Sequence, residues 1–459
     1  MSVLFRDAEV CGEVLDVAVV GSVITSVGPR QSRVRAGLEI DAHGGALLPG
    51  LHDHHLHLLA MAAALASVDC AELGGAEGLA SALRGASGTW VRAVGYHESL
   101  AGPLDRYRLD ALVDDRPVRV QHASGSLWIL NSAALRAVEH ALDDTTDVER
   151  DRDGTPTGRL WRYDERLRRA IPGQEPSLGP VGAILSALGI TGVTDATPDL
   201  DAEALALLAR ARASGGLPQR LTLLGAPVDA VLHAGISHGP RKIMIRDHDL
   251  PRFDDLVDLI SSAREGVRPV AVHCVSADSL ALTIAALSRV GPVRGDRIEH
   301  AAVVPPALVG ELVDLGVAIV TQPDLLRTRG ERYLAEVSRD EIPWLYPYCS
   351  LEAAGLHVAA SSDAPYGASD PWAVIRSARD RVTGKGRVLG RHEQVGTARA
   401  LRGYLTVADE PGGRVREVRA GRPADLCLLR RPLADVLQEP CAADVRVTVV
   451  AGDVVHHLG

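Results

Sequence analysis

The 459-residue sequence lacks the features that mark membrane, secreted and nucleic-acid-binding proteins. No stretch approaches eighteen uninterrupted apolar residues, and no basic segment followed by an apolar one stands at its start, so we expect a soluble, cytoplasmic protein. The six cysteines form no Cys-x-x-Cys pair, which argues against a disulfide framework and a zinc knuckle. The 49 basic and 59 acidic residues are interspersed, which argues against nucleic acid as the main partner.

Lysine and aromatic residues are also scarce. Only Lys242 and Lys385 are lysines among the 49 basic residues, and all the others are arginine. Arginine cannot lose its proton near neutral pH, whereas a lysine in a low-dielectric pocket becomes a neutral nucleophile. Because aromatic residues make up only 3% of the chain, we expect most of them to fill the core.

One short stretch, residues 47–57, is dense in histidine and reads Leu-Leu-Pro-Gly-Leu-His-Asp-His-His-Leu-His. In an extended strand Asp53, His55 and His57 share one face, because successive side chains point to opposite sides. Two imidazoles two residues apart can bind one metal ion. His52 and His54 point the other way, and we leave them out of the predicted metal set. Taken alone, the stretch is better explained by a histidine-rich surface loop, or by core histidines satisfied by hydrogen bonds, and the metal site rests on the rest of the chain.

The central part of the chain alternates short apolar runs with helical patterns. Eight runs predict strands, and helical patterns fall between several of them, at residues 201–213, 254–265, 277–289 and 306–315. This alternation predicts a closed (β/α)8 barrel, the TIM barrel, within the α/β class. The strands are predicted near residues 47–57, 190–196, 220–224, 242–245, 270–273, 296–300, 318–321 and 357–361.

The two ends of the chain have a different sequence pattern, which predicts strand–turn–strand at residues 1–48 and 411–459. We expect these ends to pair into one small β-sandwich domain. The barrel then spans residues 49–410. If residues 70–175 form a subdomain inserted after the first strand, the rest of this span has the length of a typical barrel, about 250 residues.

In a barrel of this kind the active site lies where the strands end, and several predicted strands deliver metal-ligand side chains there. The first gives His55 and His57, the fifth His273, the sixth His300, and Asp363 follows the eighth. Neutral imidazoles and carboxylates hold zinc or a similar divalent ion with a position open for water.

Lys242 opens the fourth predicted strand. A neutral lysine takes up carbon dioxide to form a carbamate, whose two oxygens are able to bridge two metals. The alternative is a lysine in a surface ion pair. The position of Lys242 and the bias toward arginine favour the carbamate, which would make it a carboxylated lysine.

In chain order these motifs resemble the metal-dependent amidohydrolase superfamily, and most of all its YtcJ-like branch, which is similar to N-substituted formamide deformylases. The matching motifs are Pro49-Gly50-x-x-Asp53-x-His55-x-His57, Arg297-Ile298-Glu299-His300, Ser362-Asp363-Ala364-Pro365 and Gly421-Arg422-Pro423-Ala424-Asp425-Leu426. The resemblance implies a hydrolase that cleaves a C–N bond of a small amide, formamide or cyclic amide by metal-activated hydroxide. It implies one or two divalent ions per chain, most often Zn²⁺. Asp363 is then both ligand and catalytic acid–base group, and Asp53 supports the ligands.

The chain departs from this branch at Ser124-Gly125-Ser126, where a histidine is usual, and its His122 lies upstream. This departure weakens any transfer of substrate contacts into the insertion. The residues that we expect to contact substrate are Tyr96, Arg246 and Tyr366. A homodimer is the default expectation for the assembly.

Two other functions are compatible with the same ligands. A deaminase of an amino-heterocycle is one, but the glutamate expected a few residues after His273 is absent. A metal-binding scaffold without activity is the other, and the retained Asp363 argues against it.

Overall fold

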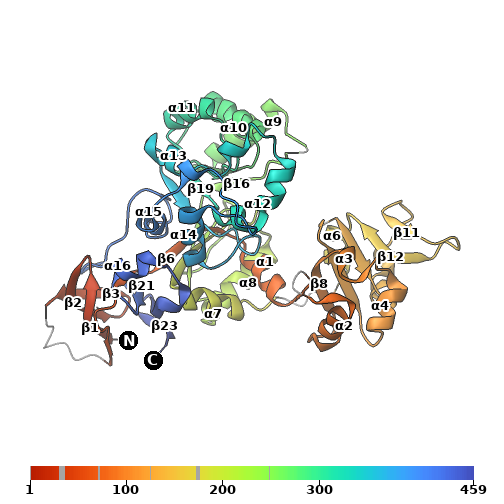
Figure 1. Ribbon diagram of the computed structural model, residues 1–459, viewed down its shortest axis with the longest axis horizontal. Helices are drawn as coiled ribbons and strands as arrows, with labels where there is room; N and C mark the ends of the chain where they lie inside the picture. The colour runs from red at the N-terminus through yellow and green to blue at the C-terminus, as the bar shows by residue number, and fades with distance from the viewer. Residues whose placement is uncertain are drawn as a thin grey trace. The chain divides into compact units, whose positions relative to one another are not determined.

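The computed structural model describes residues 2–29, 37–70, 73–124, 126–171, 176–247 and 249–458. It divides into two compact units, one made of residues 1–58 with 178–459 and the other of residues 59–177 (Figure 1). Within the described residues, no helix is long and apolar enough to cross a membrane.

The first unit contains two parallel sheets. One has four strands in the order β15-β14-β13-β6, and the other has five in the order β16-β17-β18-β19-β20. Every strand pair in both sheets is parallel. The strands are β6 (Leu51–Leu56), β13 (Ile190–Asp195), β14 (Arg220–Leu223), β15 (Ile236–His238), β16 (Arg241–Ile243), β17 (Val270–Cys274), β18 (Arg297–His300), β19 (Ala318–Thr321) and β20 (Val358–Ala360).

Backbone hydrogen bonds connect these two sheets at both ends. Lys242 N donates to Leu224 O at 3.1 Å, which connects the start of β16 to the end of β14. Just beyond β20, Asp363 N donates to His55 O at 2.8 Å, and His57 N donates to Ala364 O at 2.9 Å. The carboxyl ends of β6 and β20 therefore lie side by side.

The four predicted helices are confirmed as α8 (Ala202–Ala213), α9 (Phe253–Glu265), α10 (Ala277–Val290) and α11 (Pro306–Leu315). Side-chain caps begin two of them, α8 and α10. The Asp201 side chain accepts from Ala204 N, and Ser276 forms a reciprocal capping box with Ser279. Further helices include α7 (Gly179–Ala187), α12 (Asp324–Glu336), α13 (Cys349–Ala353), α14 (Pro371–Asp380), α15 (Thr397–Tyr404) and α16 (Leu433–Gln438).

The histidine-rich stretch is not the single strand that the sequence predicts. It is divided at Gly50 into β5 (Leu47–Pro49), which pairs with β21, and β6, which pairs with β13. A Cβ atom at Gly50 would lie 2.1 Å from Thr191 Cγ2, so only glycine fits where the chain passes from one sheet to the other.

Strands from both chain ends form two more four-stranded sheets, ordered β3-β2-β1-β4 and β23-β22-β21-β5. One buried hydrophobic cluster contains side chains of both sheets, among them Phe5, Val17, Leu426 and Val447. The strands are β1 (Ser2–Val10), β2 (Glu13–Val20), β3 (Val23–Gly28), β4 (Leu38–Asp41), β21 (Leu426–Leu429), β22 (Val445–Val450) and β23 (Asp453–His457).

The second unit has its own six-stranded sheet, ordered β11-β12-β10-β9-β8-β7. Two buried apolar clusters lie within this unit, one around Leu79 and Val120 and one around Leu135 and Leu160. Its elements are β7 (Val68–Asp69), α2 (Gly75–Gly85), β8 (Val91–Tyr96), α3 (Glu98–Ala101), α4 (Arg106–Leu112), β9 (Val118–His122), β10 (Leu127–Leu130), α5 (Ser132–Ala137), β11 (Val148–Arg150), β12 (Pro156–Trp161) and α6 (Asp164–Ala170).

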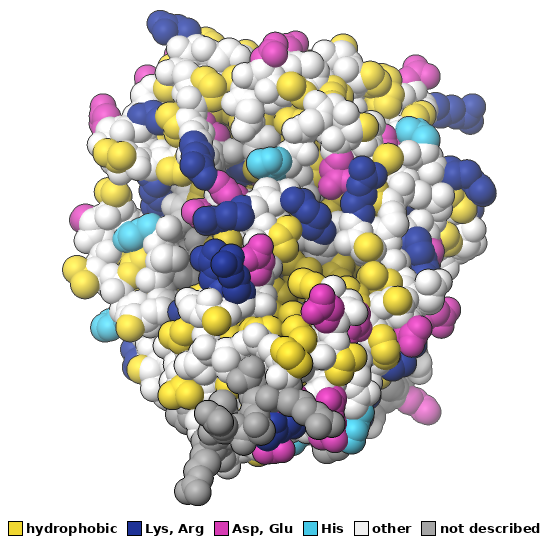
Figure 2. All heavy atoms as spheres, turned by 90° about the vertical axis from the view of Figure 1, so that its left-hand side faces the viewer, with side chains coloured by type: hydrophobic (Ala, Val, Ile, Leu, Met, Phe, Trp, Pro, Cys, Tyr) yellow, Lys and Arg dark blue, Asp and Glu magenta, His cyan; other side chains and the backbone are white. Residues whose placement is uncertain are grey.

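Charges of both signs share one face of the protein. On the face shown in Figure 2, basic and acidic side chains are intermixed, and apolar and neutral side chains lie among them. This pattern agrees with the interspersed charges of the sequence.

Candidate metal centre

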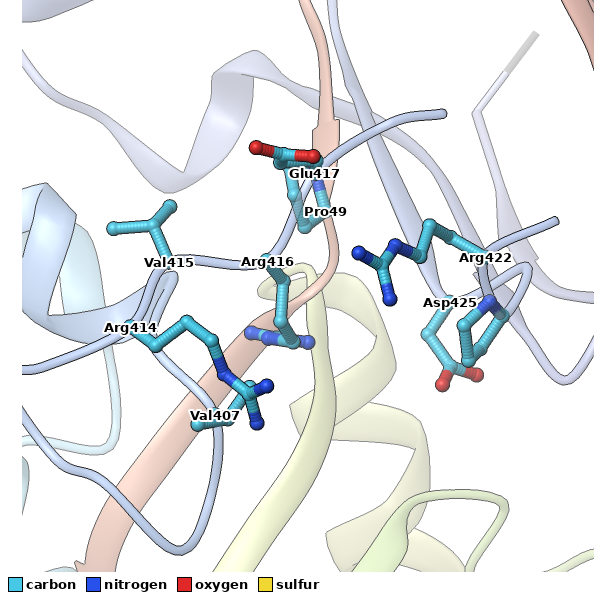
Figure 3. Close-up of a pocket in the computed structure, with 9 residues that line it drawn as sticks. Pro49, Val407, Arg414, Val415, Arg416, Glu417, Arg422 and Asp425 are labelled. Atoms are coloured by element: carbon cyan, nitrogen blue, oxygen red, sulfur yellow. The ribbon is translucent and has the colours of Figure 1, made fainter. Parts of the chain in front are cut away.

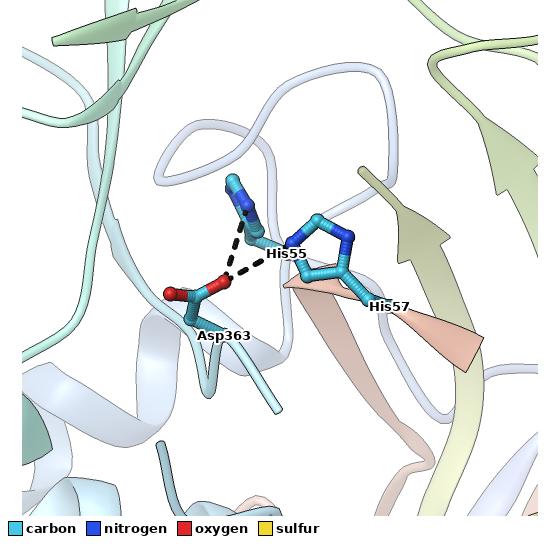
Figure 4. Close-up of side chains that lie close together, drawn as sticks. All are labelled: His55, His57 and Asp363. Atoms are coloured by element: carbon cyan, nitrogen blue, oxygen red, sulfur yellow. Dashed lines mark ion pairs between the residues drawn. The ribbon is translucent and has the colours of Figure 1, made fainter. Parts of the chain in front are cut away.

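Three ligand-type side chains meet where β6 and the loop after β20 lie side by side. His55 Nε2 is 3.5 Å and His57 Nε2 is 3.3 Å from Asp363 Oδ1 (Figure 4). One ligand atom from each residue lies within 4.8 Å of the other two. This spacing is close enough for all three to bind one metal ion.

Two further histidines continue this group into the second parallel sheet. The His300 ring lies 4.8 Å from the His55 ring and 4.4 Å from the His273 ring, between centroids. His300 ends β18 with a left-handed φ of 71°, and its Nδ1 hydrogen-bonds Gln322 Oε1 at 2.7 Å. That bond fixes the ring orientation, as hydrogen bonds to the far nitrogen of metal-bound histidines do.

Lys242 is buried in the same region, with 6% of its surface exposed. Burial lowers the pKa of its ammonium group, although the nearby Glu299 and Asp363 oppose this shift. Lys242 in turn helps to lower the pKa values of His55 and His273, after burial itself, which places its charge within electrostatic range of both. A buried lysine with a lowered pKa is easily converted to its neutral form.

Several polar atoms of this group are buried without a hydrogen-bond partner among the described residues. They are His55 Nε2, Lys242 Nζ and His273 Nδ1. Leaving a buried polar atom without a hydrogen-bond partner costs about 1–3 kcal/mol. Three such nitrogen atoms in one region indicate that they bind a common ligand. Imidazole nitrogens and a carboxylate suit a divalent cation, and the residues present therefore fit one.

The buried histidines are ready to act as ligands at neutral pH. Burial lowers the pKa of His273 to about 4 and that of His300 to about 3. Burial alone would raise the pKa of Asp363, but the hydrogen bond with His57 and the nearby His300 outweigh it and hold the pKa below its usual range. Neutral imidazoles and an ionised carboxylate are the states that bind metal.

Glu299 is a member of the site that sequence reasoning did not single out. It is fully buried on β18, and one of its carboxylate oxygens hydrogen-bonds His55 Nδ1. Its other oxygen accepts from Arg297 Nε at 2.5 Å. A carboxylate on the far nitrogen of a ligand histidine fixes its tautomer and raises its basicity. The available signal was the two-residue spacing from Arg297, which places both side chains on one face of the strand.

The other residues of the histidine stretch have separate partners. His52 Nε2 lies 2.9 Å from Thr194 Oγ1, and His54 Nε2 lies 3.0 Å from Thr406 Oγ1. Asp53 Oδ1 accepts from His55 N at 3.1 Å, so it braces the strand that carries the ligands. Burial raises the pKa of Asp53 to about 6.

The three residues expected to contact substrate lie in different surroundings. Tyr366 is 54% exposed, and its ring stands edge-on to His57 at 5.5 Å between centroids. Arg246 is exposed and lines a cavity of about 370 Å³ together with Lys242. Residue 248, two positions after Arg246, lies outside the described residues. Tyr96 is fully buried in the core of the second unit, and its hydroxyl donates to Gly102 O. This burial does not support a contact with substrate.

A separate cavity of about 290 Å³ lies at the amino end of β6, beside Pro49 (Figure 3). Arg414, Arg416 and Arg422 line it, together with Asp425. His55 and His57 lie at the opposite, carboxyl end of this strand, so the cavity is not part of the metal centre.

Comparison with known proteins places the chain in a family. A model described as "Amidohydrolase family" matches residues 38–456. The chain belongs to the amidohydrolase family. It is therefore an enzyme that acts on carbon–nitrogen bonds.

Individual relatives of this amidohydrolase are distant. It is 27% identical to an N-substituted formamide deformylase of Arthrobacter pascens over 91% of the chain and 90% of that protein. It is 24% identical to YtcJ of Bacillus subtilis strain 168, a protein named as an amidohydrolase, over 74% of each. A metal-dependent hydrolase of uncharacterised function from Pyrococcus horikoshii OT3 has the same fold. Its TM-score is 0.78 at 19% identity, with 94% of this chain and 98% of that one covered.

Proposed function

We propose that this amidohydrolase is a zinc-dependent enzyme that cleaves the C–N bond of a small amide, formamide or cyclic amide. The observation that carries the proposal is the meeting of His55, His57 and Asp363, with unsatisfied nitrogen atoms of Lys242 and His273 in the same buried region. The similarity to an N-substituted formamide deformylase makes formamides the first substrates to test.

The proposed architecture is a (β/α)8 barrel closed by pairing of β20 with β6, in which β15 and β16 together occupy the fourth strand position. The hydrogen bonds from Asp363 N to His55 O and from His57 N to Ala364 O support closure. The two sheets formed by the chain ends make up the proposed β-sandwich. The buried hydrophobic cluster that contains side chains of both sheets supports this arrangement.

The proposed ligands are His55, His57, Lys242, His273, His300 and Asp363, holding one or two Zn²⁺ ions. Two ions require a carbamate on Lys242, because an ammonium group has no lone pair to offer a cation. The burial and lowered pKa of Lys242 favour the neutral amine that reacts with carbon dioxide. Asp53 and Glu299 support the ligands without binding an ion themselves.

A bound divalent ion supplies an acidified water molecule and polarises the carbonyl of the substrate. The chain supplies the proton transfers. Asp363 is ionised at neutral pH because its neighbours lower its pKa, so it takes a proton from the attacking water. It then donates this proton to the leaving nitrogen as the C–N bond breaks, which releases an amine and a carboxylic acid.

Tyr366 and Arg246 are the residues proposed to position the substrate. Tyr366 presents an exposed ring beside His57, which suits contact with an apolar N-substituent. Arg246 lines the cavity beside Lys242 and offers hydrogen-bond donors to a polar group.

The test is metal quantification followed by a hydrolysis screen. N-substituted formamides, other N-acyl amines, cyclic amides and amino-heterocycles are each incubated with the zinc-loaded protein, and released amine, acid and ammonia are measured. Amine and acid from the formamides or N-acyl amines, or the ring-opened amino acid from the cyclic amides, support the proposal. Ammonia from the heterocycles alone identifies a deaminase instead, and zinc-loaded protein without turnover in any class contradicts the proposal.

A further inference from the structure

A second group of ligand-type side chains lies in the other compact unit, entirely outside the centre described above. Strands β8 and β9 are parallel neighbours, with Tyr96 paired to His122, so their carboxyl ends meet at one edge of the sheet. His97 directly follows β8 and His122 ends β9, while Glu98 opens α3, which is labelled in Figure 1. One ligand atom from each of these three residues lies within 4.8 Å of the others.

We propose that His97, Glu98 and His122 bind a zinc-class transition-metal ion. His122 Nε2 lies 2.9 Å from Glu98 Oε2, and the two imidazole rings are 5.7 Å apart between centroids. Two histidines and one glutamate are a ligand set that zinc uses in sites with a further position open to water.

The two histidines are held in the same way, by a serine two residues further along the chain. His97 Nδ1 lies 2.9 Å from Ser99 Oγ, and His122 Nδ1 lies 2.8 Å from Ser124 Oγ. The repeated His-x-Ser arrangement engages Nδ1 of both rings and leaves Nε2 as the ligand atom. Hydrogen bonds to the far nitrogen are what orient metal-binding histidines in proteins.

Ion binding also has consequences for the ring protons. Without an ion, the backbone N–H groups of Ser99 and Ser124 donate to these Nδ1 atoms, and His122 Nε2–H then donates to Glu98. With an ion at Nε2, the ring proton resides on Nδ1, and the serine hydroxyl accepts it. Ser99 and Ser124 are exposed, so water is able to accept from their displaced backbone N–H groups.

A simple ion pair between His122 and Glu98 is the alternative explanation of this contact. An ion pair does not explain why both imidazole rings make the same contact with a serine. It also does not explain why a ligand atom of His97 lies within 4.8 Å of those of Glu98 and His122. An ion pair is also indifferent to the serine hydroxyls, whereas loss of an orienting partner typically weakens metal binding by about 10–100-fold. The serines therefore separate the two explanations.

The experiment measures zinc bound per full-length chain at fixed free zinc, by elemental analysis. The variants are His97→Ala, His122→Ala and Ser99→Ala/Ser124→Ala, with His140→Ala, an exposed histidine of the same unit, as the matched control. We expect the wild type and the control to bind one more zinc ion than either His97→Ala or His122→Ala. The serine double variant should bind that ion about tenfold more weakly or worse.

Amide hydrolysis measured on the same samples separates this site from the amidohydrolase centre. The His97 and His122 variants should keep the zinc of the amidohydrolase centre and hydrolyse amides at the wild-type rate. If neither the wild type nor any variant hydrolyses an amide, the difference of one zinc ion per chain still tests this site. Equal zinc content in the wild type and both histidine variants overturns the proposal. So does a serine double variant that binds this ion as tightly as the wild type.

Discussion

Nδ1 of His55 hydrogen-bonds the carboxylate of Glu299, and both side chains are completely buried. The bond directs the other nitrogen, Nε2, toward Asp363. Glu299 is held in turn by Arg297, whose NH2 group also donates to His54 O at 3.1 Å. A chain of contacts thus runs from the backbone of β6 through β18 to the candidate ligand.

Replacing Glu299 with glutamine should weaken zinc binding by about 10–100-fold, because the His55 ring loses the acceptor that fixes its tautomer. Zinc affinity is measured by competition with a chelator of known strength. Glu393→Gln is the matched control, since Glu393 is also a buried carboxylate but accepts from the Tyr348 and Ser350 backbones away from the ligands. Equal affinities for both variants would show that the bond does not orient His55.

Replacing Lys242 with alanine should lower the zinc content by one ion per chain, because the carbamate that holds the second ion of the amidohydrolase centre is lost. Mass spectrometry of the intact wild-type chain under mild conditions should detect one added carbon dioxide, absent from the variant. Lys385→Ala provides the control, because Lys385 is the other lysine of the chain and is exposed. The same zinc content per chain in the wild type and Lys242→Ala would favour a mononuclear amidohydrolase centre.

Tyr366→Ala should raise KM or lower kcat/KM by about tenfold while leaving zinc content unchanged, because the ring contacts substrate and is not a ligand. Tyr107→Ala is closely matched, since both tyrosines are 54% exposed and Tyr107 lies in the other unit. If the two variants share wild-type kinetics, Tyr366 has no part in substrate binding.

His54 should make the stability of the metal-free protein depend on pH. Burial and the nearby Arg297 and Arg416 lower its pKa from 6.5 to about 3. Below about pH 6.5, His54 therefore binds a proton in the unfolded chain but not in the folded chain. Stability is complete above about pH 6.5 and falls as the pH drops from there toward about 3.

His54→Gln keeps a donor for Thr406 and removes this titration. It should reduce the loss of unfolding free energy between pH 7 and pH 5 by about 2 kcal/mol, measured by urea unfolding. His233→Gln, at an exposed histidine of the same unit, serves as the control. A pH dependence unchanged from the wild type would mean that His54 is protonated in the folded state.

The sequence predicted part of the site because some of its geometry is local. Strand parity alone separates His55 and His57 from His52 and His54, which the structure joins to Thr194 and Thr406 instead. The β/α alternation likewise identified four helices, and two of them, α8 and α10, are capped by side chains of their own sequence.

Other contacts depend on which strands become neighbours, and local patterns do not carry that information. Glu299 meets His55 across 244 positions of the chain. The division of residues 47–57 at Gly50 depends on Thr191, which comes from another strand. His97 and His122 meet only because β8 and β9 pair in parallel.

The most direct test of the account follows the rate of amine release from an N-substituted formamide while zinc is added to metal-stripped protein. The wild type should be inactive without zinc and gain turnover as zinc fills the centre at His55, His57 and Asp363. Asp363→Asn should stay at least about 10²–10⁴-fold slower even when its zinc is restored, because it cannot move the proton. Asp370→Asn, which alters the cap of α14, should behave like the wild type. Turnover by the stripped enzyme, or a zinc-loaded Asp363→Asn variant as fast as the wild type, would contradict the proposed metal centre.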